Sequence, residues 1–383
     1  MKIAMVSWEI IEMGGINRLL IGFKDGFEKL GHKVMHVRPS RNGRLKLDSK
    51  EWLKSGKDFR APAHNLGYAT EDGRKLYDKV AKWADFIFFI HPCIHPTKAN
   101  KDDRDWQYLY QTDTPIGVLF TDNLWEKFYP WIEEVKDNIT TCFFNNWNAQ
   151  FDSLAKFEHR FKFLHYPMSF ENLMHNKRRS IDVAWIPQWK KWKGIWDFVR
   201  SLSLKPDRFS TVLFNAGIEY YYMRKEPFFK QAINQDMFTG EYHNEDSLVT
   251  YYGMVSPDKM DYVYAKSIAS VDLSGMRAKK FEAQVTCTMI EAMVQKSIPI
   301  VAPQINTDDR SLLKGMDLTW PVDPDNIVDS IEEILKNEKK RKIMAKRGFE
   351  YAYEHNKDTE VAQSVIDGVM SPPKWKKKLP IFV

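Results

Sequence analysis

The sequence predicts an α/β protein made of two doubly wound domains, each a parallel sheet covered by helices. Short apolar runs of buried-strand length alternate with segments of helical periodicity in both halves of the chain. A length of 383 residues suits two cores better than one, and 43% hydrophobic with 14% aromatic residues is ample to order them. The periodicity is lost between Pro167 and Ser180, around the run Lys177-Arg178-Arg179, and we place the domain junction there.

The first half opens on an apolar run at 2–7, a loop with two glycines, and a segment ending at Gly31 whose apolar residues recur at helical spacing. A second apolar run at 32–37 completes a β-loop-α-β unit, which is typical of parallel strands joined by a helix. Further strands are expected at 85–90, 116–120 and 140–145, and helices at 73–84 and 148–157.

The second half repeats this alternation. Strands are expected at 181–186, 209–214, 251–255, 269–273 and 298–302, and helices at 195–202, from 256 onward, at 288–295, 326–336 and 339–353. Pro299 predicts that its strand has this residue at its start or lies at a sheet edge, because proline lacks the N–H that a central strand donates.

Composition excludes several classes of protein. No apolar run approaches the roughly 18 residues of a membrane helix, so we expect no membrane span. The N-terminus lacks a long apolar signal region, which indicates a cytoplasmic location. Cys93, Cys142 and Cys287 are too few and too far apart for a disulfide framework or a CxxC metal site. The net charge of +6 fits a polyanionic partner but equally fits none.

Two motifs of the first half lie where an α/β domain presents its chemistry, at the carboxyl ends of strands. Gly14 and Gly15 precede the first helix, where glycines let backbone N–H groups approach an anion or a sugar. Asp122 follows the strand at 116–120 and can act as a general base toward a hydroxyl. The competing interpretations are a plain tight turn and an N-cap or turn aspartate.

Two motifs of the second half have the same placement. Lys193 lies between a strand and a helix, where its ammonium can bind a diphosphate. Glu291 begins a helix beside a buried strand; its carboxylate can accept both hydroxyls of a ribose, while amides around Thr288 can bind a phosphate. A solvated lysine run and an ordinary surface glutamate are the alternatives. Asp323-Pro-Asp325 matches a metal-binding Asp-x-Asp pattern, but its late loop favours capping, so a divalent metal is left open and no ligand is assigned.

Together these motifs resemble glycosyltransferases of the GT-B fold. Gly14-Gly15 with Leu30-Gly31-His32-Lys33-Val34 is similar to the opening of sugar-nucleotide transferases of that class, and Glu291-Ala292-Met293 with 297–301 is similar to their nucleotide element. Within the class, the chain resembles the DNA glucosyltransferases of T-even phages. Trp192-Lys193-Gly194 and Thr288-x-x-Glu291 are similar to the α-type enzymes, and Leu119-Phe120-Thr121-Asp122 is similar to the β-type, where the aspartate is the base.

The resemblance implies an acceptor-binding domain at 1–170, a nucleotide-sugar domain at 171–350, and a C-terminal helix and tail at 351–383 that pack back on the first domain. It implies a UDP-sugar donor, UDP-glucose or UDP-arabinose, with Glu291 on the ribose, Lys193 and amides near Thr288 on the diphosphate, and Asp122 as base. The remaining expected donor-binding residues are Gly14, Gly15 and Gln188. Gln188 stands where the α-type enzymes have an arginine, so neutralisation of the diphosphate falls on Lys193 with Lys190 or Lys191. The opening resembles retaining enzymes and the Asp122 segment an inverting one, which leaves the stereochemistry open.

For the acceptor we favour a hydroxymethylated pyrimidine, such as 5-hydroxymethylcytosine, in double-stranded bacteriophage DNA. Two basic clusters of the first domain can neutralise phosphates: Arg38, Arg41, Arg44 and Lys46, and then Lys98, Lys101 and Arg104 beside Trp106. A base in a duplex must be flipped out to reach an enzyme site.

Two alternatives to this acceptor stay open, and we expect a monomer in each case. One is a transferase for a cell-envelope glycan or lipid-linked sugar, with an apolar face supplied by Tyr108, Trp125, Phe128, Tyr129 and Trp131. The other is a non-catalytic DNA-binding protein on a degenerate transferase fold.

Overall fold

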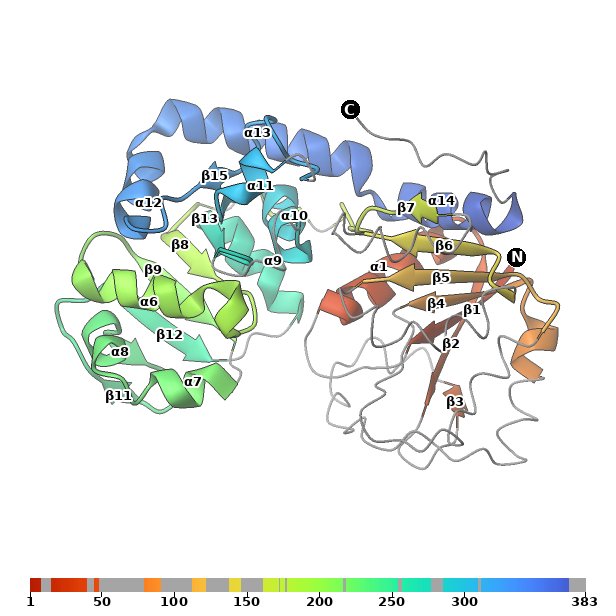
Figure 1. Cartoon of the computed structure of the whole chain (residues 1–383), viewed down its shortest axis with the longest axis horizontal. Helices are drawn as coiled ribbons and strands as arrows, with labels where there is room; N and C mark the ends of the chain where they lie inside the picture. The colour runs from red at the N-terminus through yellow and green to blue at the C-terminus, as the bar shows by residue number, and fades with distance from the viewer. Residues whose placement is uncertain are drawn as a thin grey trace. The chain divides into compact units, whose positions relative to one another are not determined.

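The computed structural model separates into two compact units, drawn in Figure 1. Unit 1 comprises residues 1–169 and 355–383, and unit 2 comprises residues 170–354. The chain passes from unit 1 to unit 2 inside the stretch where sequence periodicity is lost, and returns at 354–355. The structure describes residues 1–7, 15–39, 45–47, 79–90, 112–121, 138–145, 161–171, 173–175, 178–215, 218–253, 257–276, 285–308 and 311–371.

In its described residues, unit 1 contains a seven-stranded sheet of order β3-β2-β1-β4-β5-β6-β7. The strands are β1 (Lys2–Ser7), β2 (Lys33–Pro39), β3 (Leu45–Leu47), β4 (Phe86–Ile90), β5 (Ile116–Phe120), β6 (Thr141–Phe144) and β7 (Phe161–Phe163). Neighbouring strands are parallel except for β2 and β3, which are antiparallel. Strands β4, β5 and β6 are buried along their whole length, as expected for parallel strands covered on both faces.

Helices α1 (Gly15–Lys29) and α14 (Asp358–Met370) pack against each other in unit 1. Gly26 permits this approach, because a Cβ there would lie 2.4 Å from the backbone oxygen of Asp358. Phe23 of α1 packs edge-on against Phe88 of β4, with ring centroids 5.0 Å apart. On α14, Val369 lies against Gly117 of β5, where a Cβ would approach it to 2.8 Å. The last described helix of the chain therefore covers a sheet built from its first half.

In the described residues of unit 2, an eight-stranded sheet has the order β11-β10-β12-β9-β8-β13-β14-β15, and only β10 and β11 pair antiparallel. The strands are β8 (Ile181–Trp185), β9 (Thr211–Phe214), β10 (Gln235–Asp236), β11 (Glu241–Tyr242), β12 (Val249–Gly253), β13 (Ser267–Asp272), β14 (Ile298–Val301) and β15 (Trp320–Pro321). The helices are the 3₁₀ turn η3 (Lys191–Lys193), α6 (Ile195–Leu204), α7 (Ile218–Met223), α8 (Pro227–Ala232), α9 (Pro257–Lys266), α10 (Cys287–Val294), α11 (Gln304–Thr307), α12 (Ile327–Lys336) and α13 (Glu338–His355).

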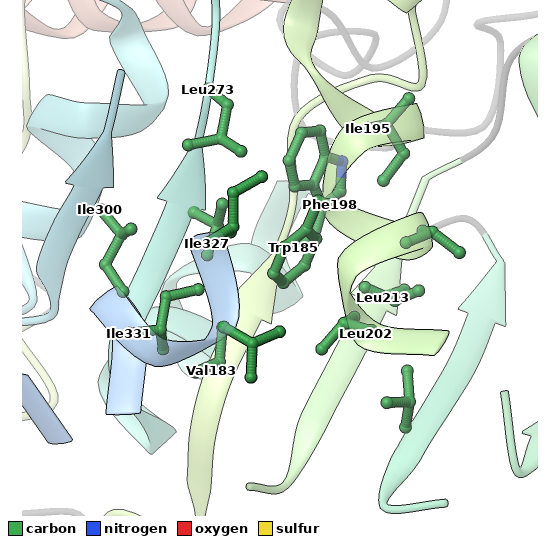
Figure 2. Close-up of a cluster of buried hydrophobic side chains, with 14 of the residues drawn as sticks. Val183, Trp185, Ile195, Phe198, Leu202, Leu213, Leu273, Ile300, Ile327 and Ile331 are labelled. Atoms are coloured by element: carbon green, nitrogen blue, oxygen red, sulfur yellow. The ribbon is translucent and has the colours of Figure 1, made fainter. Parts of the chain in front are cut away.

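The core of unit 2 lies between its sheet and the helices α6 and α12 (Figure 2). Trp185 of β8 stacks on Phe198 of α6, with ring centroids 5.5 Å apart, and both side chains are fully buried. Ile327 and Ile331 of α12 pack into the same cluster. Each such side chain contributes about 1.5–3 kcal/mol by its removal from water, so this core orders the strands whose ends form the site.

Most long elements begin and end within a few residues of the ranges expected from the sequence. Pro299 is the second residue of β14, so the start-of-strand expectation is confirmed, whereas the edge alternative is wrong because β14 lies between β13 and β15. Pairing with β15 begins only at Ile300, which leaves proline's missing donor unneeded. The short elements α7, α8, α11, β10, β11 and β15 were not expected, because two to six residues are too few to show a period.

Some expected elements cannot be compared with the structure. The expected helix at 148–157 lies outside the described residues, and of the helix at 73–84 only 79–84 are described, helical at 79–83. None of the described helices is long and apolar enough to cross a membrane.

Candidate functional site

The carboxyl ends of the parallel strands of unit 2 gather at one edge of its sheet. Lys193 follows β8 there, Asp272 is the last residue of β13, and α10 begins nearby at Cys287. The site is therefore assembled from the segments that leave β8 and β13 and from the N-terminus of α10.

Gly194 brings the segment after β8 against the segment after β13. Its φ is 78°, in the left-handed region, and a Cβ would lie 2.7 Å from Leu273 Cβ. The backbone N–H of Gly275 donates to Trp192 O at 3.0 Å, which joins the same two segments. Both contacts hold Lys193 beside the end of β13, and glycine is required at 194 on steric and conformational grounds.

Asp272 is the centre of the polar contacts at this edge. The carboxylate is 2% exposed, and it accepts hydrogen bonds from Thr286 Oγ1 at 2.6 Å, from the Ser274 amide at 3.1 Å, and from the Ser274 and Thr288 hydroxyls. Burial alone would raise the pKa of Asp272, but the Lys193 ammonium and these hydroxyls outweigh burial and hold the pKa below its ordinary value. Asp272 is therefore an ionised carboxylate that orients Thr286 and Thr288 and attracts the Lys193 ammonium.

The N-terminus of helix α10 is linked to the Asp272 carboxylate by its capping residue. Thr286 is the N-cap: its hydroxyl accepts from the Met289 amide at 3.4 Å while it donates to Asp272. The first amides of a helix carry partial positive charge and have no acceptor within the helix. Together with Lys193 they form a positive edge with the chemistry to bind a phosphate or diphosphate, and half-buried Thr288 lies at its centre.

Glu291 lies one turn further along α10. It is only 3% exposed, and Tyr264 of α9 donates its hydroxyl to Glu291 Oε2 at 3.1 Å. The alternative of an ordinary surface glutamate is therefore wrong. A carboxylate held by a tyrosine beside this positive edge can accept two vicinal hydroxyls of a sugar.

The other expected residues of unit 2 lie on the loop between β8 and η3. Gln188 is exposed on this loop. Lys190 and Lys193 flank the Trp192 ring, with Nζ atoms 5.8 and 5.1 Å from its centroid. The structure thus places Lys193 and Thr288 near Asp272, and Glu291 on the helix that carries Thr288.

The Asp-x-Asp pattern is a turn. Asp323 accepts from the Asp325 amide at 3.0 Å and from Asn326 Nδ2 at 2.8 Å, just before α12. Within the described residues no group of three metal-ligating side chains occurs.

Three of the expected site residues of unit 1 lie in the described part of the chain. Gly15 is the first residue of α1, and Arg38 of β2 pairs in register with Lys46 of β3. The remaining expected site residues lie outside the described residues: Gly14, Asp122, Arg41, Arg44, Lys98, Lys101 and Arg104. The aromatic residues proposed for a lipid-facing surface, Tyr108, Trp125, Phe128, Tyr129 and Trp131, also lie outside them.

Solved structures share this architecture along nearly the whole chain. An alpha-glucosyltransferase bound to UDP and a 13-mer DNA containing a HMU base aligns with a TM-score of 0.72 and 15% identity, covering 97% of this chain and 99% of that one. The chain has the GT-B fold. An alpha-glucosyltransferase with UDP-glucose and DNA containing an abasic site aligns at 0.71 and 15% identity, and Anabaena Alr3699/HepE with UDP and glucose aligns at 0.61 and 13%; each covers 97% of this chain and 100% of the other.

The expectation of a GT-B fold resembling the phage DNA glucosyltransferases is thereby confirmed. No protein-family model matches the chain, and no curated protein matches its sequence. At these identities the likeness concerns the fold, so the roles of individual residues rest on the geometry described above.

Asp272, Ser274 and Thr286 were not among the site residues predicted from the sequence. A signal was present, because Thr286 stands as an N-cap immediately before an apolar helical run, and Asp272 directly follows the apolar run that forms β13.

Proposed function

We propose that the protein is a glycosyltransferase that moves glucose or a related sugar from a UDP-sugar to a hydroxymethylated pyrimidine in double-stranded DNA. The observation that carries the proposal is the positive edge of unit 2, where Asp272 hydrogen-bonds to Thr288 and to the N-cap Thr286 of α10 and attracts the nearby Lys193. Solved proteins of the same fold that hold UDP or UDP-glucose, one of them with DNA, support it.

In this proposal unit 2 binds the donor. Lys193 and the first amides of α10 bind the diphosphate, and Glu291 accepts the ribose hydroxyls. As the bond to the sugar breaks, negative charge grows on the departing UDP. Cations and helix N-termini that are already in place stabilise such charge without reorganisation, and this is the chemistry that Lys193 and α10 supply.

Unit 1 binds the acceptor in this proposal. Asp122 acts as the base that removes the proton of the attacking hydroxyl. Arg38 and Lys46, neighbours in the β2–β3 register, contact the DNA backbone together with the other basic residues of this half. The target base leaves the duplex to reach the donor, as for other enzymes that modify a base.

The test is incubation of the protein with UDP-glucose or UDP-arabinose and DNA that contains 5-hydroxymethylcytosine, followed by mass spectrometry of the nucleosides. We expect a hydroxymethyl nucleoside heavier by one sugar, a product lost in Lys193→Ala and retained in Lys225→Ala. Lys225 is the matched control because it is an exposed lysine of the same unit, after α7.

The competing functions give different results in the same assay series. A protein that binds DNA without binding UDP is a non-catalytic DNA-binding protein on this fold. A protein that binds UDP and floats with lipid vesicles, but leaves DNA unmodified, acts on a lipid-linked or envelope acceptor. Asp122→Asn is expected to abolish turnover and spare UDP affinity, and appreciable residual activity would refute its assignment as the base.

A further inference from the structure

Asn215 joins the carboxyl ends of three neighbouring strands of unit 2. It directly follows β9, its backbone N–H donates to Gly253 O at the end of β12 at 2.7 Å, and its Nδ2 donates to Ile186 O just beyond β8. Its φ of 63° lies in the left-handed region, which asparagine adopts more readily than most residues. The side-chain amide is thus fixed at the same sheet edge as Lys193 and Asp272.

The oxygen of the Asn215 side-chain amide forms no hydrogen bond within the described part of the chain. Asn215 is 6% exposed, and its Oδ1 is buried with no hydrogen-bond partner among the described residues. Burying an unsatisfied carbonyl is destabilising, and a glycine would tolerate the positive φ without it. An acceptor that is held in place through its own nitrogen, and whose oxygen remains unpaired, is suited to receive a donor from a ligand.

The position of Asn215 relative to the positive edge suits the base of a bound nucleotide. In the sheet order β9-β8-β13, one strand separates Asn215 from the end of β13. Neighbouring strands lie about 4.8 Å apart, so Asn215 lies roughly 10 Å along the edge from Asp272. Lys193 and α10 mark the diphosphate, and Asn215 lies about a ribose and a base away.

An aromatic pair flanks this position. Phe214, the residue before Asn215, stacks on Tyr252 of β12 with ring centroids 5.3 Å apart and an interplanar angle of 17°. Tyr252 remains 46% exposed. An exposed ring beside a buried acceptor offers the two features by which proteins bind a heterocyclic base, a stacking surface and a directional hydrogen bond.

We propose that Asn215 determines the base specificity of the donor, an inference that rests on the proposed function. Its Oδ1 accepts the N3–H of uracil. Cytosine carries a lone pair at N3, so two acceptors would face each other and the Asn215 oxygen would stay unsatisfied. Sites built to pair with a substrate group reject analogues that lack it, because their buried polar atoms are left unpaired. Asn215 therefore selects uridine over cytidine diphosphates.

The test measures the affinity of the full chain for UDP, CDP and ribose 5-diphosphate by calorimetry. The wild type is expected to bind UDP about tenfold more tightly than CDP, the scale of one buried hydrogen bond. Asn215→Gly keeps the positive φ and removes the oxygen, so UDP affinity falls about tenfold, while CDP and ribose 5-diphosphate change less than about twofold.

Asp317→Gly is the matched control. Asp317 has a φ of 53° in the loop that precedes β15, at the amino end of that strand, so the same kind of substitution should leave all three affinities unchanged.

Two results would overturn the assignment of Asn215. One is an unchanged ratio of UDP to CDP affinity in Asn215→Gly; the other is an equal loss for UDP and ribose 5-diphosphate, which indicates a structural role. Failure of the proposed function looks different. If the wild type binds none of the three probes, or if Lys193→Ala leaves the binding of all three unchanged, the donor site itself is misplaced and both proposals fall.

Discussion

Replacing Asp272 with asparagine perturbs the polar centre of unit 2 while preserving its shape. The wild-type carboxylate accepts three hydroxyl hydrogen bonds and one amide hydrogen bond, all at a position that is 2% exposed. Asparagine keeps one acceptor oxygen and presents an NH₂ group where the other was. If the NH₂ replaces Oδ2, it faces the hydroxyls of Thr286 and Thr288, both of which donate in the wild type.

The loss of stability expected for Asp272→Asn follows from the hydrogen bonds that change. Hydrogen bonds to a charged acceptor stabilise by about 1.5–3 kcal/mol and neutral ones by about 1 kcal/mol, so weakening the two on Oδ2 lowers the free energy of unfolding by about 2–3 kcal/mol. In a unit of this size, that corresponds to a melting temperature lower by about 5–10 °C.

The pH dependence of stability is a second and more specific test of the role of Asp272. The pKa of Asp272 in the folded protein lies below its ordinary value of 3.8, so the unfolded chain binds the extra proton first as pH falls. The stability that Asp272 contributes is present above pH 3.8 and is lost as pH falls through the folded pKa. The difference between wild type and Asp272→Asn should therefore shrink below about pH 4.

Urea denaturation at pH 7 and at steps down to pH 3 measures both effects. Asp329→Asn is the control, because Asp329 forms an exposed pair with Lys205 and should change stability by less than about 1 kcal/mol. An Asp272→Asn protein as stable as the wild type, or a destabilisation that stays constant from pH 7 to pH 3, would refute the account of Asp272.

Three further substitutions test other parts of the structure. Gly194→Ala should lower the free energy of unfolding, measured in urea, by more than about 2 kcal/mol, because it adds a Cβ at positive φ against Leu273. Gly240→Ala is the control: Gly240 has the same φ of 78° but open space around it, so its loss of stability measures the cost of the positive φ alone. Arg179→Met should destabilise unit 2 by about 2–4 kcal/mol, because the Arg179 guanidinium donates to the carbonyl oxygens of Ser267, Gln295 and Lys296. Arg178→Met is the control. Equal stability of the two variants would contradict this structural role of Arg179. His165 is half-buried and stacks on His355; its partial burial, and then that neighbour, lower its pKa to about 4. The unfolded chain therefore takes up the proton first, and stability is lost as pH falls from 6.5 to 4. His165→Phe should flatten this loss, by up to about 3 kcal/mol in chemical denaturation, and an unchanged pH profile would exclude the effect.

The fold was predictable because several of its central strands, such as β4, β5, β6 and β14, are buried on both faces. Such strands form continuous apolar runs, as in 86–90 and 116–120, and each is separated from the next by a helical pattern or a loop. Lys193, Thr288 and Glu291 were found through motif resemblance. The burial of Glu291 was not foreseen, since nearly every residue of α10 is buried and the helix shows no polar face to contrast with it.

Asp272 and Asn215 show what the sequence could not reveal. Each is a single polar residue at the end of an apolar strand, which is the usual composition of a turn. Their roles come from partners 14 to 29 positions away: Thr286 and Thr288 for Asp272, and Ile186 for Asn215. Local patterns carry no information about such pairs, so the polar centre of this sheet edge emerges only from the folded chain.

The return of the chain to unit 1 also governs how the protein is made. Residues 170–354 form a compact unit that is complete before α14 leaves the ribosome, whereas unit 1 awaits its last helix. Until then Gly26 of α1 and Gly117 of β5, which lie against α14, have no covering helix. Synthesis therefore finishes unit 2 first, and the sheet made earliest is the last to be closed, which makes a chain shortened at residue 357 a natural target for chaperones and proteases.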